Sequence, residues 1–253
     1  MKLFIIQLCN MYMKLFFLLL SFNVFCQENI IDSNNLKQGP WILYFPYNSD
    51  SIISEKGYFI NSQEEGLWLK YFDNNMIREI SNYNKGLLNG ERFSFDKRGR
   101  IQSQEFFLNN NPHGTQLYYF ESGKISGEYN YLEGLLNGNM TSYYKNGNIK
   151  ENVVYVNNYK HGLARWFFDN GQLSVQYNYN NGNIEGESFT YYKEGQLKSS
   201  AVYLSNHKHG KYILYFPSGM IKKDGNYNHG KKNGEWLTYD SLGAKINSIK
   251  YNK

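Results

Sequence analysis

A glycine returns every 24 residues along most of this chain, without an insertion. The glycines that keep this period are Gly66, Gly90, Gly114, Gly138, Gly162, Gly186, Gly210 and Gly234. A fixed period of this length indicates a repeat protein, in which each unit is one small supersecondary structure packed on its neighbours. We number the positions of each repeat from this opening glycine, which is position 0.

Aromatic and aliphatic residues recur at fixed positions within the repeats. In the repeat of Gly138, position 5 is Tyr143, position 11 is Ile149 and position 17 is Tyr155. Because alternate residues of a strand face one side of a sheet, we expect positions 3 and 5 to share a face, and positions 11 and 17 likewise. Asn146-Gly147, at positions 8 and 9, is typical of a hairpin turn. Each repeat therefore predicts one β-hairpin.

The complete pattern predicts an all-β protein, an elongated single-sheet antiparallel β-meander of about nine 24-residue hairpin repeats. The first repeat opens at Gly39 and has a longer turn around residues 46–50. About 18 strands at roughly 4.8 Å spacing would extend about 85 Å. We expect residues 1–26 to be a signal peptide, 27–38 a leader and 39–253 the repeat domain.

The segment that precedes the leader has the pattern of an export signal. Met13-Lys14 is followed by an apolar run that ends at Cys26. A basic start, a short apolar core and a cleavage point predict a cleaved signal peptide and an exported protein, periplasmic, cell-surface or secreted. Two alternatives remain open, a lipoprotein attached through Cys26 and a retained membrane anchor. Translation from either Met1 or Met13 fits this pattern.

A second period of 48 residues overlies the first. Position 20 alternates between glycine and asparagine, as in Gly134, Asn158 and Gly182. We expect this alternation to reflect two alternating kinds of turn between hairpins.

No residue pattern predicts catalysis or a cofactor. Both cysteines lie in residues 1–26, and the nucleophile, zinc-protease and phosphate-loop motifs are absent. His113, His161 and His209 recur 48 residues apart, which four strands would separate by about 19 Å, too far for one metal ion. His207, His209 and His229 are closer in sequence, and we interpret them as at most an adventitious metal cluster. We therefore expect no metal site, no cofactor and no enzymatic activity.

The charge of the chain argues against nucleic acid as a partner. Its 27 Lys and Arg stand against 22 Asp and Glu, and these charges are interspersed. Nucleic-acid binding requires a concentrated basic surface.

An aromatic row at position 6 is the candidate binding surface. It follows position 5 directly, so a regular strand would direct it to the opposite face. Its members are Phe45, Phe72, Phe120, Tyr144, Phe168, Tyr192 and Phe216. Such a row could bind peptides, glycans or lipid headgroups, or it could simply pack against neighbouring repeats and lysine stems. Asp96 and Asp240 interrupt it.

Three tryptophans stand at position 2 of terminal repeats. They are Trp41, Trp68 and Trp236, and we expect them to help cover the ends of the sheet.

Several units resemble the MORN-repeat variant family. They include Asn137-Gly138-x4-Tyr143-Tyr144-x2-Gly147-x-Ile149, His161-Gly162-x4-Phe167-Phe168-x2-Gly171-x-Leu173, Glu65-Gly66-Leu67-Trp68 and Asn233-Gly234-Glu235-Trp236. The resemblance covers residues 38–251 and implies consecutive hairpins in an elongated antiparallel meander. Bacterial proteins of this type are often labelled putative antitoxins, and the wider family's name suggests membrane or lipid contact. An exported chain fits poorly with a cytoplasmic antitoxin.

Taken together, the sequence predicts an exported, non-enzymatic repeat scaffold that binds an unknown protein or a component of the cell envelope. An antitoxin or immunity-type protein is the first alternative, and a lipid-surface binding module with weak membrane contact is the second. Whether the sheet forms oligomers is open.

Overall fold

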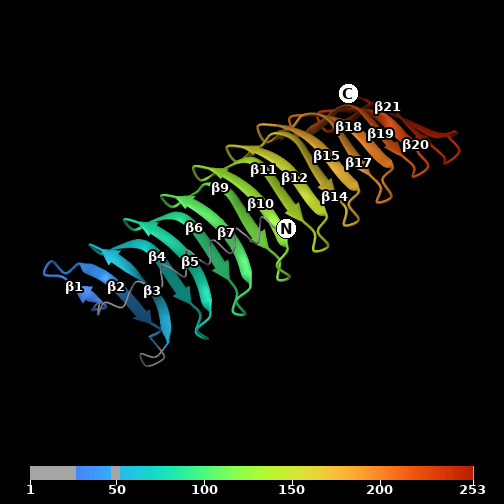
Figure 1. Cartoon of the computed structure of the whole chain (residues 1–253). Coiled ribbons are helices and arrows are strands. Elements are labelled where there is room, and N and C mark those ends of the chain that lie inside the picture. Colours follow the sequence, from blue (N-terminus) through green and yellow to red (C-terminus); the bar gives the residue numbers. More distant parts are fainter. Residues whose placement is uncertain (1–26, 47–51, 253) are drawn as a thin grey trace.

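The computed structural model describes residues 27–46 and 52–252, which form one open antiparallel sheet of 22 strands in a meander (Figure 1). The first eleven strands are β1 (Ile30–Ile31), β2 (Lys37–Tyr44), β3 (Ile53–Ile60), β4 (Gln63–Tyr71), β5 (Ile77–Asn84), β6 (Leu87–Phe95), β7 (Ile101–Leu108), β8 (Asn111–Pro112), β9 (Gly114–Tyr119), β10 (Ile125–Leu132) and β11 (Leu135–Tyr143). The others are β12 (Ile149–Val156), β13 (Tyr159–Lys160), β14 (Gly162–Phe167), β15 (Leu173–Asn180), β16 (Asn183–Ile184), β17 (Gly186–Tyr191), β18 (Leu197–Leu204), β19 (His207–Tyr215), β20 (Ile221–Asn228), β21 (Lys231–Tyr239) and β22 (Lys245–Tyr251). The predicted all-β meander is confirmed.

Three of the expected strands are interrupted at one residue. β8 and β9 are separated by His113, β13 and β14 by His161, and β16 and β17 by Glu185. The 22 strands, less these three interruptions and the two-residue β1, leave the 18 strands of nine hairpins.

Two kinds of turn connect the strands, one kind at each end of the strands (Figure 1). We call the side of the sheet formed by the turns within hairpins the tip edge, and the side formed by the turns between hairpins the link edge. Tip turns, at positions 6 to 10, close each hairpin. In the repeat of Gly138, the amide of Tyr144 donates to the carbonyl of Asn148, and the amide of Gly147 donates to the carbonyl of Tyr144, both at 2.8 Å. Gly147 has φ 95°. This is the geometry of a type I turn followed by a left-handed residue, which explains the glycine at position 9.

Each tip turn is followed by a bulge that changes which residues share a face. Gly138 pairs with Tyr155 and Tyr143 pairs with Ile149, with a register shift beside Tyr143. Gly138 and Tyr143 are five residues apart on a regular strand, so they face opposite sides, and cross-strand partners share a face. Positions 11 and 17 therefore lie on opposite faces, and the prediction that they share one was wrong. Residues an even number of positions apart no longer share a face where an extra residue, Lys150, enters the strand between them.

The opening glycine explains the period of the chain. Gly138 has φ 111°, and the pairing of β10 with β11 shifts register between Tyr129 and Tyr131, opposite this glycine. A positive φ at this bulge favours glycine over residues with a side chain. Every opening glycine pairs with the aromatic residue at position 17 of its own repeat, as Gly138 does with Tyr155.

Link turns join one repeat to the next, and their backbone is of one kind. Asn157 and Asn158 have φ 49° and 69°, and Asn181 and Gly182 in the next link turn have 47° and 83°. Two positive φ values are the mark of a type I′ turn. The expectation of two alternating kinds of turn was therefore wrong for the backbone.

The alternation lies in a side-chain hydrogen bond instead. The amide of Asn158 donates to the carbonyl of Leu136 at 2.9 Å, and the amide of Leu136 donates back to Asn158 Oδ1 at 2.7 Å. Gly182 makes only the first bond, to Lys160, and a Cβ on Gly182 would lie 3.2 Å from the ring of Tyr159. A residue with a side chain at position 182 would therefore require the Tyr159 ring to shift.

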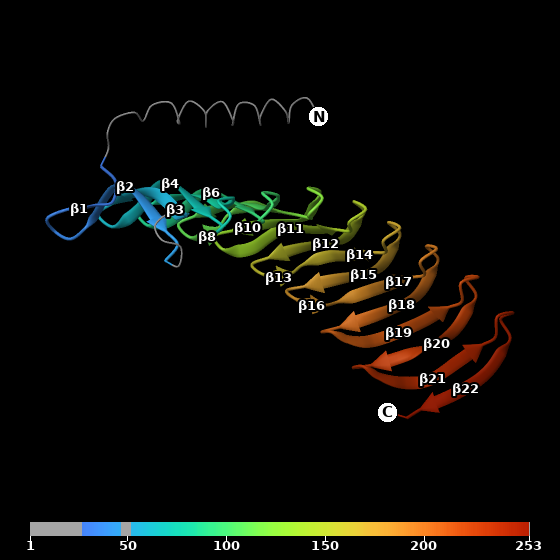
Figure 2. The same cartoon turned by 90° about the horizontal axis from the view of Figure 1, so that it is seen from below.

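The core lies on one face of a single twisted layer (Figure 2), which we call the core face. It carries positions 2, 15 and 17, and Trp68, Val153 and Trp236 on it are at most 2% exposed. Trp41, Phe59, Trp68 and Tyr83 pack edge to face at centroid distances of 5.1 to 6.4 Å. All three tryptophans at position 2 are buried in terminal repeats, where they form the core of this face. The opposite side is the outer face.

Residues 27–38 extend the sheet. Ile30 and Ile31 pair with Gln38 and Lys37 across a turn like the tip turns. The side chain of Asn29 makes two hydrogen bonds to the backbone of Ile42, at 2.9 and 3.1 Å. An amide side chain thus takes the place of a paired strand along this edge of β2. The predicted signal peptide and Cys26 lie outside the described residues.

Candidate functional site

The aromatic row at position 6 lies along the tip edge. Each member is the first residue of a tip turn, after the strand has ended, and each is half-buried. The row runs through Phe45, Phe72, Phe120, Tyr144, Phe168, Tyr192 and Phe216. Asp96 and Asp240 replace an aromatic ring with a carboxylate that accepts two backbone amides of its own turn. Position 6 can therefore be occupied either by an aromatic residue or by an aspartate that accepts hydrogen bonds from its own turn.

Several members of the row hold neighbouring repeats together. The hydroxyls of Tyr144 and Tyr192 donate to the carbonyls of Phe167 and Tyr215, in each case at 2.8 Å and one repeat further on. Lys198 and Lys222 lie over the rings of Tyr192 and Phe216, at 5.6 and 5.3 Å from the centroids. These contacts correspond to the packing role that the sequence left open for this row.

Ion pairs join the tips at two steps of the meander. Lys97 contacts Asp73 at 2.9 Å, and Lys193 contacts Asp169 at 2.7 Å. All four residues are at position 7, where acidic and basic residues alternate, so the 48-residue period extends to the charges. These hydrogen-bonded lysines lower the pKa of Asp73 and of Asp169.

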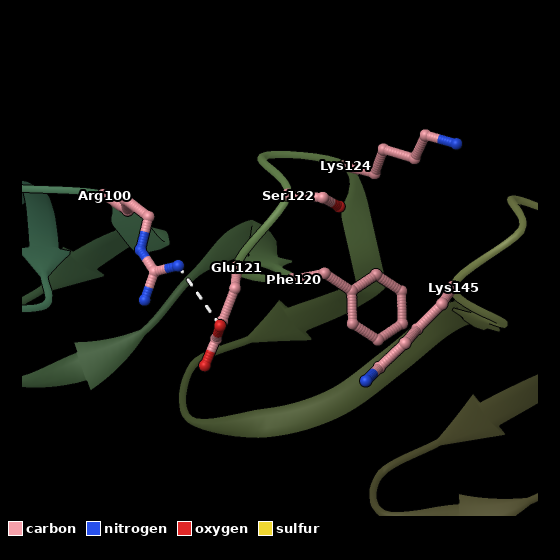
Figure 3. Close-up of a pocket in the computed structure, with 6 residues that line it drawn as sticks. All are labelled: Arg100, Phe120, Glu121, Ser122, Lys124 and Lys145. Carbon is pink, nitrogen blue, oxygen red and sulfur yellow. Dashed lines mark hydrogen bonds and ion pairs between the residues drawn. The ribbon is translucent and has the colours of Figure 1, made fainter.

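A hollow of about 520 Å³ interrupts this regular edge (Figure 3). Its lining comes from three consecutive tips and consists of Arg100, Phe120, Glu121, Ser122, Lys124 and Lys145. The side chain at position 10 of each repeat determines whether such a hollow forms beside the next tip. Met76 and Met220 at this position cover Gly99 and Gly243 of the next tip, whereas a Cβ on Gly123 or Gly147 would meet nothing within 4 Å. Arg100 and Lys124 leave those two glycines uncovered.

Among the described residues, only one of the three basic side chains in the hollow is paired with carboxylates. Arg100 bridges Asp96 at 2.6 Å and Glu121 at 3.1 Å. The hydrogen bond from Arg100 and those from two backbone amides lower the pKa of Asp96. Lys124 and Lys145 make no ion pair within the described part of the chain. Figure 3 shows Lys124 extended outward and Lys145 beside the ring of Phe120.

A second surface, which the sequence reasoning missed, lies on the outer face along the link edge. We call it the link-edge stripe. It consists of exposed apolar residues at positions 1, 16, 18 and 21. Its members are Tyr58, Ile60, Leu67, Leu87, Phe106, Leu108, Leu132, Leu135, Val156, Tyr159, Leu163 and Leu204, each 39% to 62% exposed. Their recurrence beside the link turns was the signal in the sequence.

The histidines lie near the same edge but form no three-residue metal cluster among the described residues. The rings of His209 and His229 approach edge to face at a centroid distance of 4.8 Å. His207 instead bonds to the carbonyl of Ser205 at 2.8 Å. Of the three histidines considered as an adventitious cluster, the structure brings His209 and His229 into ring contact.

In the described residues, no helix has the length and apolar character to span a membrane.

Two solved structures show weak similarity to this chain. A crystal structure described as TcdB2-TccC3-Cdc42 matches 87% of this chain but only 15% of its own chain, at 10% identity and a TM-score of 0.21. A porin-like protein from Bacteroides uniformis matches 68% of this chain and 88% of its own, at 7% identity and a TM-score of 0.18. At these TM-scores neither supports an argument. Curated proteins provide no match.

The family comparison is specific. The model described as MORN repeat variant matches six segments, which are residues 64–85, 112–133, 136–157, 160–181, 184–204 and 208–229. These segments cover just over half of the chain, and each spans one hairpin. The chain belongs to the MORN repeat variant family.

Proposed function

We propose that this protein is an exported, non-enzymatic scaffold that binds a protein partner along the link-edge stripe. A repeat scaffold for protein or membrane interaction is compatible with the family. The observation that carries the proposal is the stripe itself, twelve large apolar side chains at least 39% exposed along one edge.

The stripe suits a protein partner because of its arrangement. Leu132 pairs directly with Leu135, and Val156 with Tyr159, so apolar pairs stand beside successive link turns on one face. Scattered exposed apolar residues are normal, but a contiguous apolar row with polar neighbours is typical of an interaction surface. Asparagines at the link turns provide a polar border that can hydrogen-bond to a partner.

Two alternatives are carried with this proposal. An antitoxin or immunity protein would use the same stripe to bind a toxin. A lipid-surface module would insert the stripe into a membrane, but Glu65, Glu133 and Glu185 border it at the link edge. Carboxylates there disfavour an anionic lipid surface.

The stripe can be tested by site-specific photo-cross-linking in the native host. A photoreactive residue at Leu132 or Tyr159 should give a discrete cross-linked protein, and one at Leu242, which is 87% exposed but lies in a tip turn, should not. The substitution Leu135→Asn should abolish the product from position 132 while leaving the circular dichroism unchanged. Equal cross-linking from Leu242, or products insensitive to Leu135→Asn, would refute the stripe as the binding surface.

Localisation and the alternatives need separate measurements. The proposal expects the mature chain outside the cytoplasm, with the mass of a chain cleaved after Cys26. A full-length cytoplasmic chain would refute export and favour the antitoxin alternative. A Cys26 with a lipid modification would identify a lipoprotein. Pelleting with zwitterionic liposomes that is lost in Leu135→Asn would favour the lipid alternative over a protein partner.

A further inference from the structure

We propose that the hollow between the tips of three consecutive repeats binds an acidic sugar, with its carboxylate at Lys145 and its ring against Phe120. This inference is independent of the link-edge stripe, because the two surfaces lie on opposite edges of the sheet.

The first argument is an ion pair that the repeat leads us to expect and that is missing. At position 7, Asp73 pairs with Lys97, and Asp169 pairs with Lys193. The intervening pair would be Glu121 with Lys145, but Glu121 bonds to Arg100 instead, at 3.1 Å. Lys145 therefore has no ion-pair partner among the described residues, whereas its counterparts Lys97 and Lys193 each contact a carboxylate of the preceding repeat. A ligand carboxylate would restore this pattern.

The second argument is the open space beside Lys145. The side chain at position 10 covers the next glycine at Gly99, Gly171, Gly195 and Gly243. Arg100 turns to Asp96 and Glu121, and Lys124 extends outward (Figure 3), so Gly123 and Gly147 are uncovered. Two consecutive uncovered tips produce a half-open hollow of about 520 Å³, in which a bound sugar would remain partly exposed to solvent.

The third argument is the ring in this hollow. Tyr144 and Tyr192, at the same position in other repeats, donate their hydroxyls to the next repeat. Phe120 has no hydroxyl, and its ring faces the hollow beside Lys145 (Figure 3). An aromatic face presents apolar surface with a negative quadrupole, which suits the C–H face of a sugar ring. Ser122 lies in the same lining and can hydrogen-bond to a sugar hydroxyl.

Together these groups select an acidic sugar over its fragments. Lys145 supplies positive charge, Phe120 supplies a stacking surface, and Ser122 supplies a hydroxyl. The carboxylate of Glu121 in the same lining is already paired with Arg100. Inorganic phosphate would use only the charge, and a neutral sugar only the ring and the hydroxyl. We therefore expect sodium glucuronate to bind more tightly than either glucose or phosphate.

The test is an amide NMR titration of the full mature chain with sodium glucuronate, glucose and inorganic phosphate. Glucuronate should produce saturable shifts in residues 120–124 and 145, with a Kd about twofold to fivefold lower than that of glucose or phosphate, the ratio that one exposed ion pair provides. Lys145→Gln and Phe120→Ala should each weaken glucuronate binding by about the same factor.

Lys193→Gln is the matched control, because it removes a position-7 lysine that is paired with Asp169. It should leave glucuronate binding unchanged. Asp96 stands at position 6 in another tip, so the fold accepts a residue without a ring there, and circular dichroism should confirm that Phe120→Ala is folded. The proposal is overturned if glucuronate gives no saturable shift at residues 120–124, if phosphate binds equally well, or if Lys193→Gln weakens binding as much as Lys145→Gln.

Discussion

The indole ring of Trp68 lies over Gly57 on the neighbouring strand, in the space that a Cβ on Gly57 would occupy. Trp236 lies over Gly225 in the same way at the other end of the sheet. Both rings are 2% exposed, although no second layer of described residues covers them. A single-layer sheet can bury a tryptophan if the adjacent strand has no side chain at the point of contact, and the ring in turn shields the glycine backbone.

A methyl group at residue 57 should therefore destabilise the first repeats. Gly57→Ala would force the Trp68 ring away, and overpacking of this kind costs about 1 to 3 kcal/mol. The free energy of unfolding from urea titration measures the loss, and hydrogen exchange should locate it in β3 and β4. The matched control is Gly57→Ala in a Trp68→Ala background. There the added methyl group should cost nothing, and an equal cost in both backgrounds would contradict the contact.

Replacement of Trp236 by alanine should fray the last repeat. The ring stacks with Tyr212 and packs edge to face with Tyr227 and Tyr251, at centroid distances of 5.0 to 6.4 Å. Loss of a buried tryptophan costs about 3 to 5 kcal/mol, and in a repeat protein the effect concentrates on its neighbours. Amide exchange should accelerate in β20 to β22 and remain slow in β10 to β12. Leu242→Ala, at an 87% exposed residue of the same repeat, serves as the control and should change nothing.

The hairpins were predictable because their residues are fixed by local geometry. Gly138 and Gly147 recur since a bulge and a turn each require a positive φ, and Tyr155 recurs since it pairs with the glycine. The face assignment failed at Lys150, where one extra residue in the strand reverses the alternation. No period in the sequence reveals such a bulge.

The surfaces were less accessible to sequence reasoning. The aromatic row at position 6 was predicted from the sequence. Its packing role depends on hydrogen bonds such as that from the Tyr144 hydroxyl to the Phe167 carbonyl, which the sequence alone does not reveal. The hollow depends on the direction in which Arg100 and Lys124 turn, and Arg100 is held both by Asp96 in its own tip and by Glu121 in the next tip. The link-edge stripe was visible as paired apolar residues such as Leu132 and Leu135, and it was missed because asparagines such as Asn84 and Asn180 interrupt position 18.

Replacing the asparagine of a link turn should lower the free energy of unfolding by about the contribution of one hydrogen bond. Asn158→Gly keeps the positive φ but removes the bond from the Leu136 amide to Asn158 Oδ1, so we expect a loss of about 0.5 to 1.5 kcal/mol. Asn158→Ala should cost more, because a left-handed residue with a Cβ but no polar side chain adds about 1 to 2 kcal/mol. Urea unfolding of the two variants gives the order. The reverse exchange, Gly182→Asn, should also destabilise, since its Cβ would lie 3.2 Å from the Tyr159 ring. A neutral Gly182→Asn would show that the alternation has another cause.

The free energy of unfolding of this protein should fall as the pH rises above about 10. Burial, followed by the effect of Tyr177, raises the pKa of Tyr203 from 10.0 to about 12. Burial also raises the pKa of Tyr155, Tyr179 and Tyr212 on the same face. An unfolded tyrosine ionises near pH 10, so above that pH the unfolded chain binds fewer protons than the folded chain, and the free energy of unfolding falls as pH rises. This contribution is fully present below pH 10 and disappears as the pH passes the raised values.

Thermal unfolding followed by circular dichroism between about pH 8 and pH 11.5 measures this loss. Part of the rise in tyrosinate absorbance should accompany unfolding, because the half-buried tyrosines of the core face ionise when that face opens. Tyr203→Phe removes one titrating group and should make the fall in stability with pH shallower. Tyr159→Phe is the matched control, since Tyr159 is 62% exposed, and its pH dependence should equal that of the parent chain. If Tyr203→Phe leaves the fall in stability with pH as steep as in the parent chain, burial of Tyr203 on the core face does not control this pH dependence.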